Sequence, residues 1–392
     1  MKENLVIIGN GFDLECSLKS SYGDFFKNRI STELMDLFNE VYKIYLDNKH
    51  IEFVSIFFSS EIPLQIQGEQ FKAYIHQDQY QKLRKANLTF WDLVFLTMGM
   101  SANSYWHNVE DNIRLFLDKE IDRNTNYSTI GMKDTSNEIR VNHNIRFCCI
   151  LAFALLEEDR YKKSIDIYDF LYKELRIFEK DFTEYLMQEF QVRLPIYTIK
   201  FPELMQAILG PDSTDYLNDN YSILSFNYTR YYRIGGEISN IHGTLQDENI
   251  IFGIDQKSIR SDTPEYRFTK TFRKLTQVNK SKNEVTISGK DKLKKIFFYG
   301  HSLSELDYSY FQSIFDYYDI YSSEVKLIFC CTHFDKNRTK EEILQAQTLA
   351  ASKLIETYGS SMGKEREQHG KNLLHKLMLE DRVDVRIIRP TY

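Results

Sequence analysis

Apolar residues follow two patterns along the chain, and the first is a short unbroken run near the N-terminus. Residues 4–8 read Asn-Leu-Val-Ile-Ile and are followed by Gly9. An apolar run of this length that ends at a turn residue predicts a strand buried on both faces, as in the centre of a parallel sheet. Ser20 and Ser21 then precede Tyr-Gly-Asp-Phe-Phe and are candidate N-caps of a helix. The chain therefore opens as strand, glycine turn, loop and helix.

Helical spacing dominates from about residue 24 to about residue 215. Helices are predicted around 34–48, 105–121, 145–157 and 163–192. In the last of these, apolar residues recur three and four positions apart, which buries one face of a helix. The polar segment 124–142 is expected to form a surface loop. We interpret 31–215 as a helical insertion or lid, because it is long enough to be a unit of its own.

Strand patterns return in the last part of the chain. They lie at 221–226, 238–242, 250–254, 295–300, 325–331 and 383–388. Strands separated by helical segments are typical of an α/β fold with helices on a parallel sheet. The sequence thus predicts a Rossmann-like, doubly wound parallel sheet with a large helical insertion. In this interpretation residues 1–30 and 216–392 form the nucleotide-binding core and 31–215 form the insertion.

Composition narrows the class of protein. The 392 residues are 42% apolar and 27% charged, which is ordinary for a globular protein and argues against wholesale disorder. The net charge of −6 gives no global reason to expect nucleic acid or a membrane as a partner, although local patches leave nucleic acid open. Five cysteines without zinc-site spacing lead us to expect no metal. No stretch is apolar enough to span a membrane and the N-terminus does not resemble a signal peptide, so a cytoplasmic location is expected.

The turn after the first predicted strand carries the first candidate site. Residues 9–13 read Gly-Asn-Gly-Phe-Asp. Two glycines allow a tight turn and a close approach of the backbone to a phosphate, and the following helix directs its amides there. The third glycine of the dinucleotide-binding fingerprint is absent, so a plain strand-to-helix turn is the alternative. Asp13 is expected either to bind a ribose or to cap the turn.

Two polar side chains follow the next predicted strands. Ligands bind at the carboxyl ends of the strands in an open α/β sheet, and Asn227 and His242 both fall there. The Asn227 amide offers a donor and an acceptor for a ribose hydroxyl or a water, and a helix N-cap or a turn residue is its alternative role. His242, which precedes Gly243, is suited to act as a base near neutral pH. A hydrogen-bonded structural histidine is the alternative there.

A fourth candidate segment spans residues 299–308. A predicted strand ends at Tyr299, Gly300 allows a close approach, and a hydroxyl-rich loop with two carboxylates follows. This loop is suited to hold a ribose or the edge of an adenine. Ser304 and Asp307 have the spacing of a capping box that starts a helix, and both roles are compatible.

Two further segments have simpler interpretations. Residues 257–295 carry 12 Lys and Arg against 4 Asp and Glu, which allows a contact with phosphates of a ligand or a nucleic acid. A solvated loop is favoured there, because no pattern of stacking aromatic residues accompanies the charges. Residues 106–110, Trp-His-Asn-Val-Glu, are most simply one face of an amphipathic helix.

The motifs and their order resemble a known family. They occupy residues 7–14, 21–25, 225–229, 241–243, 252–255 and 300–308. Together they resemble the AbiH family of bacterial antiphage proteins, which act in abortive infection. The Gly-Asn-Gly-Phe-Asp and Gly-His-Ser-Leu motifs carry most of the resemblance, and it spans both ends of the chain.

A more distant similarity is to sirtuin-like NAD-consuming domains. These domains also combine a Gly-x-Gly turn, an Asn at a strand end, a His before Gly and a late Gly-x-Ser-Leu loop. By that similarity, the glycine turn faces a pyrophosphate, Asn227 orients the nicotinamide ribose or a water, and His242 is the base. The similarity thus implies Asn227 and His242 as catalytic residues. The implied ligand-binding residues are Gly9, Asn10, Gly11, Phe12, Asp13, Thr229, Gly300, His301 and Ser302, the last three on the adenosine side.

The chain departs from sirtuin deacylases in two respects. Those enzymes carry Gln-Asn-Ile-Asp where this chain has Phe-Asn-Tyr-Thr at 226–229. Thr229 therefore takes the place of the Asp that helps to hold nicotinamide. The chain also has no four-cysteine zinc module, so deacylation of proteins is not expected.

The resemblance implies an antiphage effector that binds NAD, as substrate or ligand, and hydrolyses it to nicotinamide and ADP-ribose. Such cleavage passes through an oxocarbenium-like state, so a protein must position the ribose and stabilise the spreading positive charge. A nuclease or nucleotide-processing effector that uses 257–295 and a non-catalytic nucleotide-binding sensor are the alternatives. Besides the nucleotide, the expected partners are a phage-derived trigger and a second copy of the chain or another protein.

Overall fold

A computed structural model gives the arrangement of most of the chain. It describes residues 2–48, 64–99, 109–120, 147–156, 160, 167–211, 213–231, 237–256, 259–277, 289, 292–363 and 370–391. The predicted surface loop at 124–142 and residues 106–108 lie outside these ranges. Within these ranges, no helix has the length and apolar character needed to cross a membrane.

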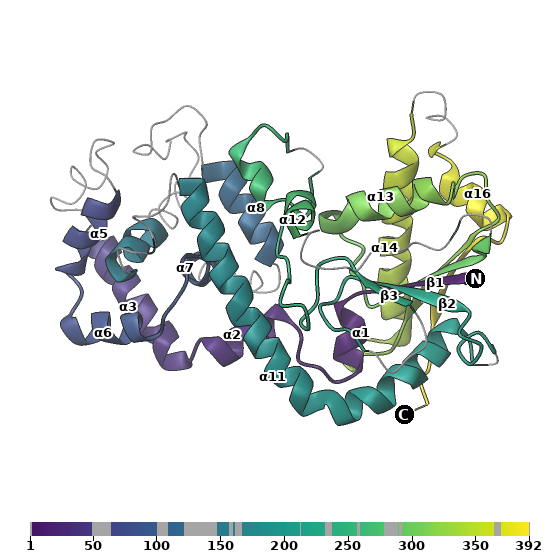
Figure 1. Ribbon diagram of the computed structural model, residues 1–392, viewed down its shortest axis with the longest axis horizontal. Coiled ribbons are helices and arrows are strands. Elements are labelled where there is room, and N and C mark those ends of the chain that lie inside the picture. The colour runs from purple at the N-terminus through teal and green to yellow at the C-terminus, as the bar shows by residue number, and fades with distance from the viewer. Residues whose placement is uncertain are drawn as a thin grey trace.

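Six parallel strands of the described chain form one sheet (Figure 1). They are β1 (Asn4–Ile8), β2 (Tyr221–Ser225), β3 (Glu237–Asn240), β4 (Lys295–Tyr299), β5 (Lys326–Cys331) and β6 (Val383–Ile387). Their order is β3-β2-β1-β4-β5-β6, and every neighbouring pair is parallel. This is the order of a doubly wound Rossmann sheet, so the predicted fold class is confirmed. The order reverses between β1 and β4, which is where such sheets bind ligands.

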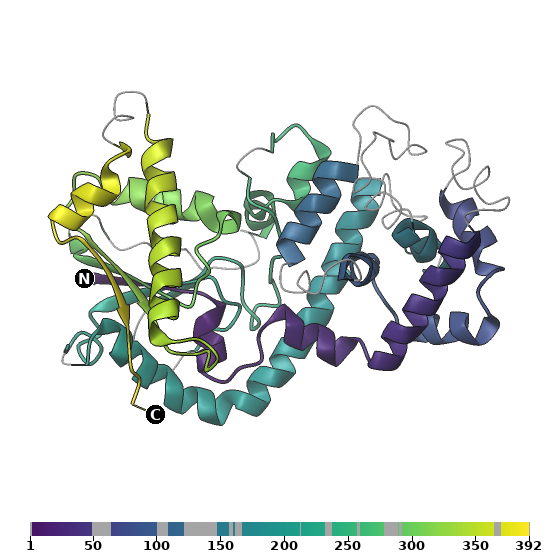
Figure 2. The ribbon, with the colours of Figure 1, turned by 180° about the vertical axis from the view of Figure 1, so that it is seen from behind.

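Strand β1 shows how the sheet is covered on both faces. Side chains alternate along a strand, and Leu5 and Ile7 belong to one apolar cluster while Val6 and Ile8 belong to the other. The first face is covered by α13 (Tyr308–Tyr317), α14 (Lys340–Ser361) and α16 (Leu373–Leu379). Figure 2 shows α14 crossing this face. The other face is covered by α1 (Asn10–Glu15) and the second half of α11 (Ile167–Leu209).

The predicted helical insertion contributes a second lobe beside the sheet (Figure 1). Its helices include α3 (Thr32–Asn48), α5 (Leu64–Lys72), α6 (Gln77–Lys85), α7 (Phe90–Gly99), α8 (Val109–Glu120) and a helical stretch at 147–155. Helix α2 (Tyr22–Arg29) leads into this lobe, and the Ser21 hydroxyl caps it by accepting from the Asp24 amide at 3.1 Å. Ser20 does not cap; its hydroxyl donates to the Asn10 side chain instead. Of the two candidate caps, only Ser21 is confirmed.

Helix α11 joins the lobe to the sheet. It was predicted to end near residue 192 but continues to Leu209 through Pro195 and Pro202, and Figure 1 shows it curving under the sheet. Prolines bend a helix that tertiary packing holds together on both sides of them. The first half packs on α7, and the second half carries Phe201, whose ring lies 4.9 Å from that of Phe12 in α1. One helix therefore belongs to both parts of the molecule.

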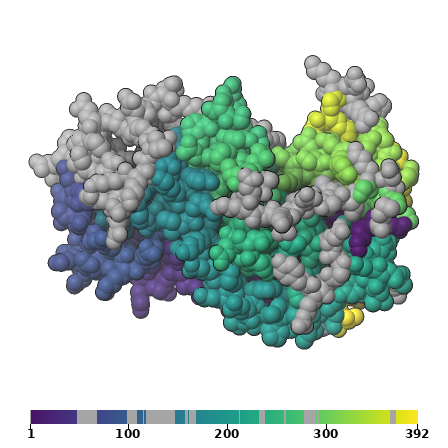
Figure 3. All heavy atoms as spheres, in the orientation of Figure 1, coloured from purple at the N-terminus to yellow at the C-terminus, as the bar shows by residue number. Residues whose placement is uncertain are grey.

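The predicted strand at 250–254 is wrong. Only Ile254 makes an isolated bridge, to Thr269, and the segment lies outside the sheet. Its apolar residues are buried for another reason: the Phe252 ring packs against Phe178 of α11 at 5.6 Å. An extended segment buried between two lobes has the same apolar pattern as a strand. It leads to η2 (Pro264–Phe268) and α12 (Lys270–Gln277), whose green surface lies between the two lobes in Figure 3.

Candidate functional site

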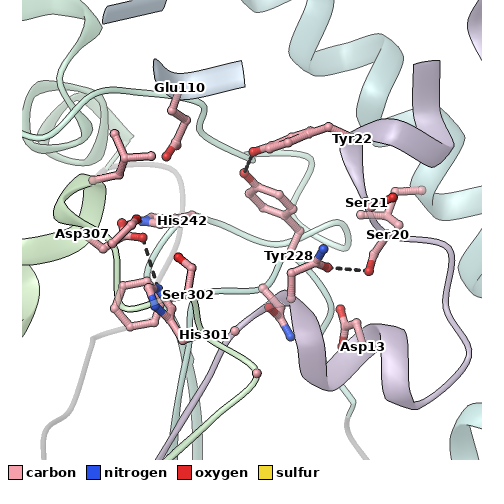
Figure 4. A pocket seen from close by; sticks show the side chains of 18 residues that line it. Asp13, Ser20, Ser21, Tyr22, Glu110, Tyr228, His242, His301, Ser302 and Asp307 are labelled. Carbon is pink, nitrogen blue, oxygen red and sulfur yellow. Dashed lines mark hydrogen bonds and ion pairs between the residues drawn. The ribbon is translucent and has the colours of Figure 1, made fainter. Parts of the chain in front are cut away.

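A pocket of about 440 Å³ opens at the carboxyl ends of β1 to β4, beside the point where the strand order reverses (Figure 4). This volume lies in the range of small-molecule sites. The pocket is lined by eight of the residues predicted from the sequence: Gly9, Asn10, Asp13, Asn227, His242, Gly300, His301 and Ser302. Three predicted residues lie elsewhere. Phe12 is buried in the core, Thr229 is buried behind Asp13, and Gly11 lines a second pocket.

The two glycines of the first turn make room for another loop of the protein. A Cβ on Gly9 would lie 2.7 Å from the Cα of His301, and a Cβ on Gly11 would lie 2.7 Å from the Cα of Gly300. The Gly11 amide donates to the Gly300 carbonyl at 2.7 Å. These contacts favour the plain-turn interpretation of the glycines, because the Gly11 amide is engaged within the protein. Contact of Gly9 with a ligand stays a prediction.

Asn227 carries the most unusual feature of the pocket. The residue is 4% exposed, and within the described part of the chain neither Nδ2 nor Oδ1 of its amide has a hydrogen-bond partner. Its backbone amide donates to the Ser225 hydroxyl at 3.1 Å, and no helix starts at this turn. The helix N-cap interpretation is therefore wrong, whereas the alternative of a turn residue stays open, since Asn227 lies at a bend directly after β2. A buried amide that lacks both partners is rare and calls for an explanation.

Asp13 adds a buried carboxylate to the same wall. Its two oxygens accept from the hydroxyls of Tyr197 and Thr229, both at 2.7 Å. Burial raises the pKa of Asp13 to about 6, although these hydroxyls act to lower it. The nearby Asn227 amide also acts to lower the pKa of Asp13, although the two side chains do not form a hydrogen bond. Asp13 neither caps the turn nor points to solvent, so its carboxylate is held in place from behind.

His242 enters the pocket from the turn after β3. The next residue, Gly243, has φ +84° and would place a Cβ only 2.2 Å from a carbonyl oxygen, so only glycine fits there. The Nε2 of His242 lies 3.3 Å from Oδ1 of Asp307. Burial and the positive charge of Lys270 lower the pKa of His242 to about 4, so the ring is neutral at pH 7.

Asp307 is the centre of a buried polar cluster. Its Oδ1 accepts from the Lys270 ammonium at 2.6 Å, and its Oδ2 lies 3.2 Å from Nε2 of His301. Burial acts to raise the pKa of Asp307, but Lys270 and the two histidines outweigh it and hold this pKa well below its usual range. A short helix, η4 (Glu305–Asp307), begins directly after Ser304, as the sequence predicted, but Asp307 binds Lys270 and makes no side-chain capping bond at the start of α13. Asp255 binds the Ser309 amide at that helix end instead, at 3.0 Å.

The tautomer of His301 follows from its neighbours. The Leu303 amide donates to Nδ1 of His301 at 2.9 Å, so this nitrogen is the acceptor. The proton must then reside on Nε2, which donates to Asp307. Asp307 thus fixes the orientation of one histidine ring and lies against the other.

The basic segment at 257–295 supplies buried cations to this region of the molecule. The side chains of Lys270 and Arg273 are 3% and 1% exposed, and Arg273 pairs with Glu179 at 2.6 Å. For these two residues the solvated-loop interpretation is wrong. Their charges are neutralised within the protein and do not form a surface for nucleic acid.

Glu110 is a site residue that the sequence did not predict. It was assigned to an amphipathic helix face, but it is 8% exposed, lines the pocket, and binds the Lys270 ammonium at 2.8 Å. Burial raises the pKa of Glu110 to about 7, although Lys270 opposes this. Neither Glu110 nor Lys270 belongs to a recognised motif, so no local pattern indicates their pairing. Tyr22 and Tyr228, whose hydroxyls lie 3.5 Å apart across the pocket, do lie in motif segments.

A second pocket, of about 780 Å³, adjoins the first at the carboxyl ends of β4 and β5. It shares Gly300, His301 and Ser302 with the first pocket. Lys200 and Arg338 line it, together with an apolar wall from α14. In the described ranges, no group of three or more His, Cys, Asp or Glu is arranged to hold a metal ion.

Comparison with known proteins identifies the family. The family model described as "Bacteriophage abortive infection AbiH" matches residues 5–329, which include both pockets' shared loop, Asn227 and His242. No curated protein and no solved structure gives a significant match. The match supports a role in abortive infection against bacteriophage. The chain belongs to the AbiH family.

Proposed function

We propose that the protein binds NAD in these pockets during phage infection and hydrolyses it to nicotinamide and ADP-ribose. The unpartnered amide of Asn227 is the observation that carries the proposal. Two unsatisfied polar atoms in a buried site are costly unless a ligand completes them, and a ribose diol or a bound water supplies both a donor and an acceptor. The motif pattern that the sequence shares with sirtuin-like NAD-consuming domains points to the same ligand.

The charges around the pocket suit the cleavage of this bond. The bond between C1′ of the ribose and the pyridinium nitrogen breaks with its electron pair moving to the nitrogen, so neutral nicotinamide leaves and positive charge spreads over the ribose. The carboxylate of Asp13 lines the pocket beside Asn227 and favours such a charge electrostatically. A water adds to C1′, and its proton passes to the neutral ring of His242. The Asp307 carboxylate lies 3.3 Å from this ring and stabilises the positive charge that the ring then carries.

The second pocket supports a dinucleotide as the ligand. The loop of Gly300 and Ser302 separates two cavities at the reversal of the strand order, which is where doubly wound sheets bind dinucleotides. We assign the nicotinamide ribose to the pocket of Asn227 and the adenosine half to the side of Lys200. The Gly11 amide is already bonded, so this assignment does not use it for the pyrophosphate.

The test is nicotinamide release by the purified protein from NAD, with and without phage lysate. Asn227→Ala and His242→Ala should abolish release and phage protection while the protein stays folded. His375→Ala, an exposed histidine on α16, is the matched control and should retain both. If both pocket variants still protect cells, the catalytic assignment is wrong.

Two binding measurements, with NAD and with a polynucleotide, separate the alternatives. NAD binding without turnover would favour a non-catalytic sensor. Polynucleotide binding that weakens steeply with salt would favour a nuclease. The buried pairing of Lys270 and Arg273 gives that last alternative less support than the sequence did.

A further inference from the structure

We propose that Glu110 is a positioning residue of this site, supplied by the helical insertion to fix Lys270, Asp307 and, through Asp307, the two pocket histidines. The inference rests on the proposed function, because the reaction in which these histidines take part is the proposed hydrolysis of NAD. It makes the insertion a structural part of the site, because α8 contributes a group that the core does not contain. Figure 4 shows Glu110 reaching from α8 toward His242 and Asp307.

Four short contacts connect α8 to the histidines. The Glu110 carboxylate lies 2.8 Å from Nζ of Lys270, and Nζ lies 2.6 Å from Oδ1 of Asp307. From Asp307, Oδ2 is hydrogen-bonded to Nε2 of His301 at 3.2 Å, whereas Oδ1 lies 3.3 Å from Nε2 of His242 as a close electrostatic contact without a hydrogen bond. Every side chain in this chain of contacts is at most 11% exposed. Lys270 does not line the pocket, so little solvent is available to replace a lost partner of its ammonium.

The Lys270 ammonium explains why Glu110 matters. It has three N–H donors, and its three acceptors are Glu110 Oε2, Asp307 Oδ1 and the Leu306 carbonyl at 3.3 Å. Without the Glu110 carboxylate, the buried cation loses one of its two anionic partners, which is unfavourable even where a neutral glutamine oxygen still accepts from Nζ. The ammonium would then shift toward Asp307, and the carboxylate would turn away from the position in which it binds His301 and lies against His242.

The other oxygen of Glu110 ties it to the core as well. Its Oε1 accepts from the Gly253 amide at 3.4 Å, so both carboxylate oxygens contact residues outside the insertion. Glu110 and Lys270 are 160 positions apart in the sequence. A displacement of α8 would thus break the chain of contacts at its first link, which gives the insertion a direct physical means of controlling the histidines.

The test compares Glu110→Gln with the wild type in two measurements. Spectra of ¹⁵N-histidine-labelled protein report the tautomers and the pH midpoints of His242 and His301, and steady-state kinetics report NAD hydrolysis. The groups that face His242 are Lys270, Asp307, His301 and the ring of Tyr310, with Glu110 acting through Lys270. Glu110→Gln should shift both histidine signals and lower kcat by up to about 100-fold, with KM unchanged.

Two further variants separate positioning from a loss of stability. Glu110→Asp keeps the charge and should restore part of the activity. Glu174→Gln removes another buried carboxylate of the insertion. Glu174 does not line the pocket and pairs with Arg160 at a distance of 2.7 Å, so this variant should leave the histidine signals in place. Unchanged histidine signals in Glu110→Gln, equal shifts in Glu174→Gln, or shifted signals with full kcat would each overturn the proposal. If the wild type releases no nicotinamide, the proposed function fails, and the histidine spectra still decide whether Glu110 positions the cluster.

Discussion

Replacing Asp13 by asparagine should stabilise the folded protein above pH 6 while it lowers activity. The carboxylate is 1% exposed, and its pKa rises from 3.8 to about 6. Asparagine has nearly the same shape and can still pair with the hydroxyls of Tyr197 and Thr229, because a hydroxyl can turn from donor to acceptor. The substitution therefore removes mainly the buried negative charge.

The magnitude follows from the pKa shift. A rise from 3.8 to about 6, at about 1.36 kcal/mol for each unit, costs the wild type about 3 kcal/mol of unfolding free energy. Below pH 3.8 both the folded and the unfolded state hold the proton, so this cost is absent. The cost grows as pH rises from 3.8 to about 6. Above pH 6 it is constant, because Asp13 is ionised in both the folded and the unfolded state. Roughly half of it should be present at pH 5.

Urea unfolding of the wild type and Asp13→Asn at several pH values between 5 and 8 measures this difference. The variant should gain stability over the wild type as pH rises to about 6.5 and then keep a constant advantage. The exposed residue Asp36 on α3 provides the control Asp36→Asn. Nicotinamide release should fall in Asp13→Asn, because the charge that favours a cationic ribose is gone. A stability difference that does not vary with pH, or a variant that is both more stable and fully active, would refute this reasoning.

Two further predictions concern the frame of the site. Gly243→Ala should lower the unfolding free energy by at least about 1–2 kcal/mol, because φ is +84° and the added methyl meets a carbonyl oxygen, whereas Gly363→Ala, with open space around it, should not. Thermal unfolding checks both, and equal melting temperatures would contradict the prediction. Arg273→Gln should cost about 3–5 kcal/mol because it leaves Glu179 buried without its cation, while the exposed Arg260→Gln should cost under about 0.5 kcal/mol. If instead Arg273→Gln folds stably and loses only affinity for polynucleotides, the segment is a nucleic-acid surface after all.

Several parts of the fold and site could be predicted because they have local patterns. A strand buried on both faces is a short apolar run, as at 4–8. In a parallel sheet, the residues that follow such strands all lie at the carboxyl ends of the strands, whichever strands are neighbours. That logic placed Asn227 and His242 in one pocket. The same logic failed at 250–254, because burial between two lobes produces an apolar run without strand pairing.

The sequence by itself determined the parallel α/β class, the strand ends that bear polar groups, and the resemblance that the family match confirms. Only the tertiary structure decided which charges meet. In the sequence, Glu110 is one polar residue on a helix face and Lys270 is one of twelve cations in its segment. Nothing in the residues around either one indicates a partner 160 positions away. Packing also decided that Asp307 binds Lys270 and His301 and lies against His242 instead of capping a helix, because a buried carboxylate binds the cations and donors that the fold brings within reach.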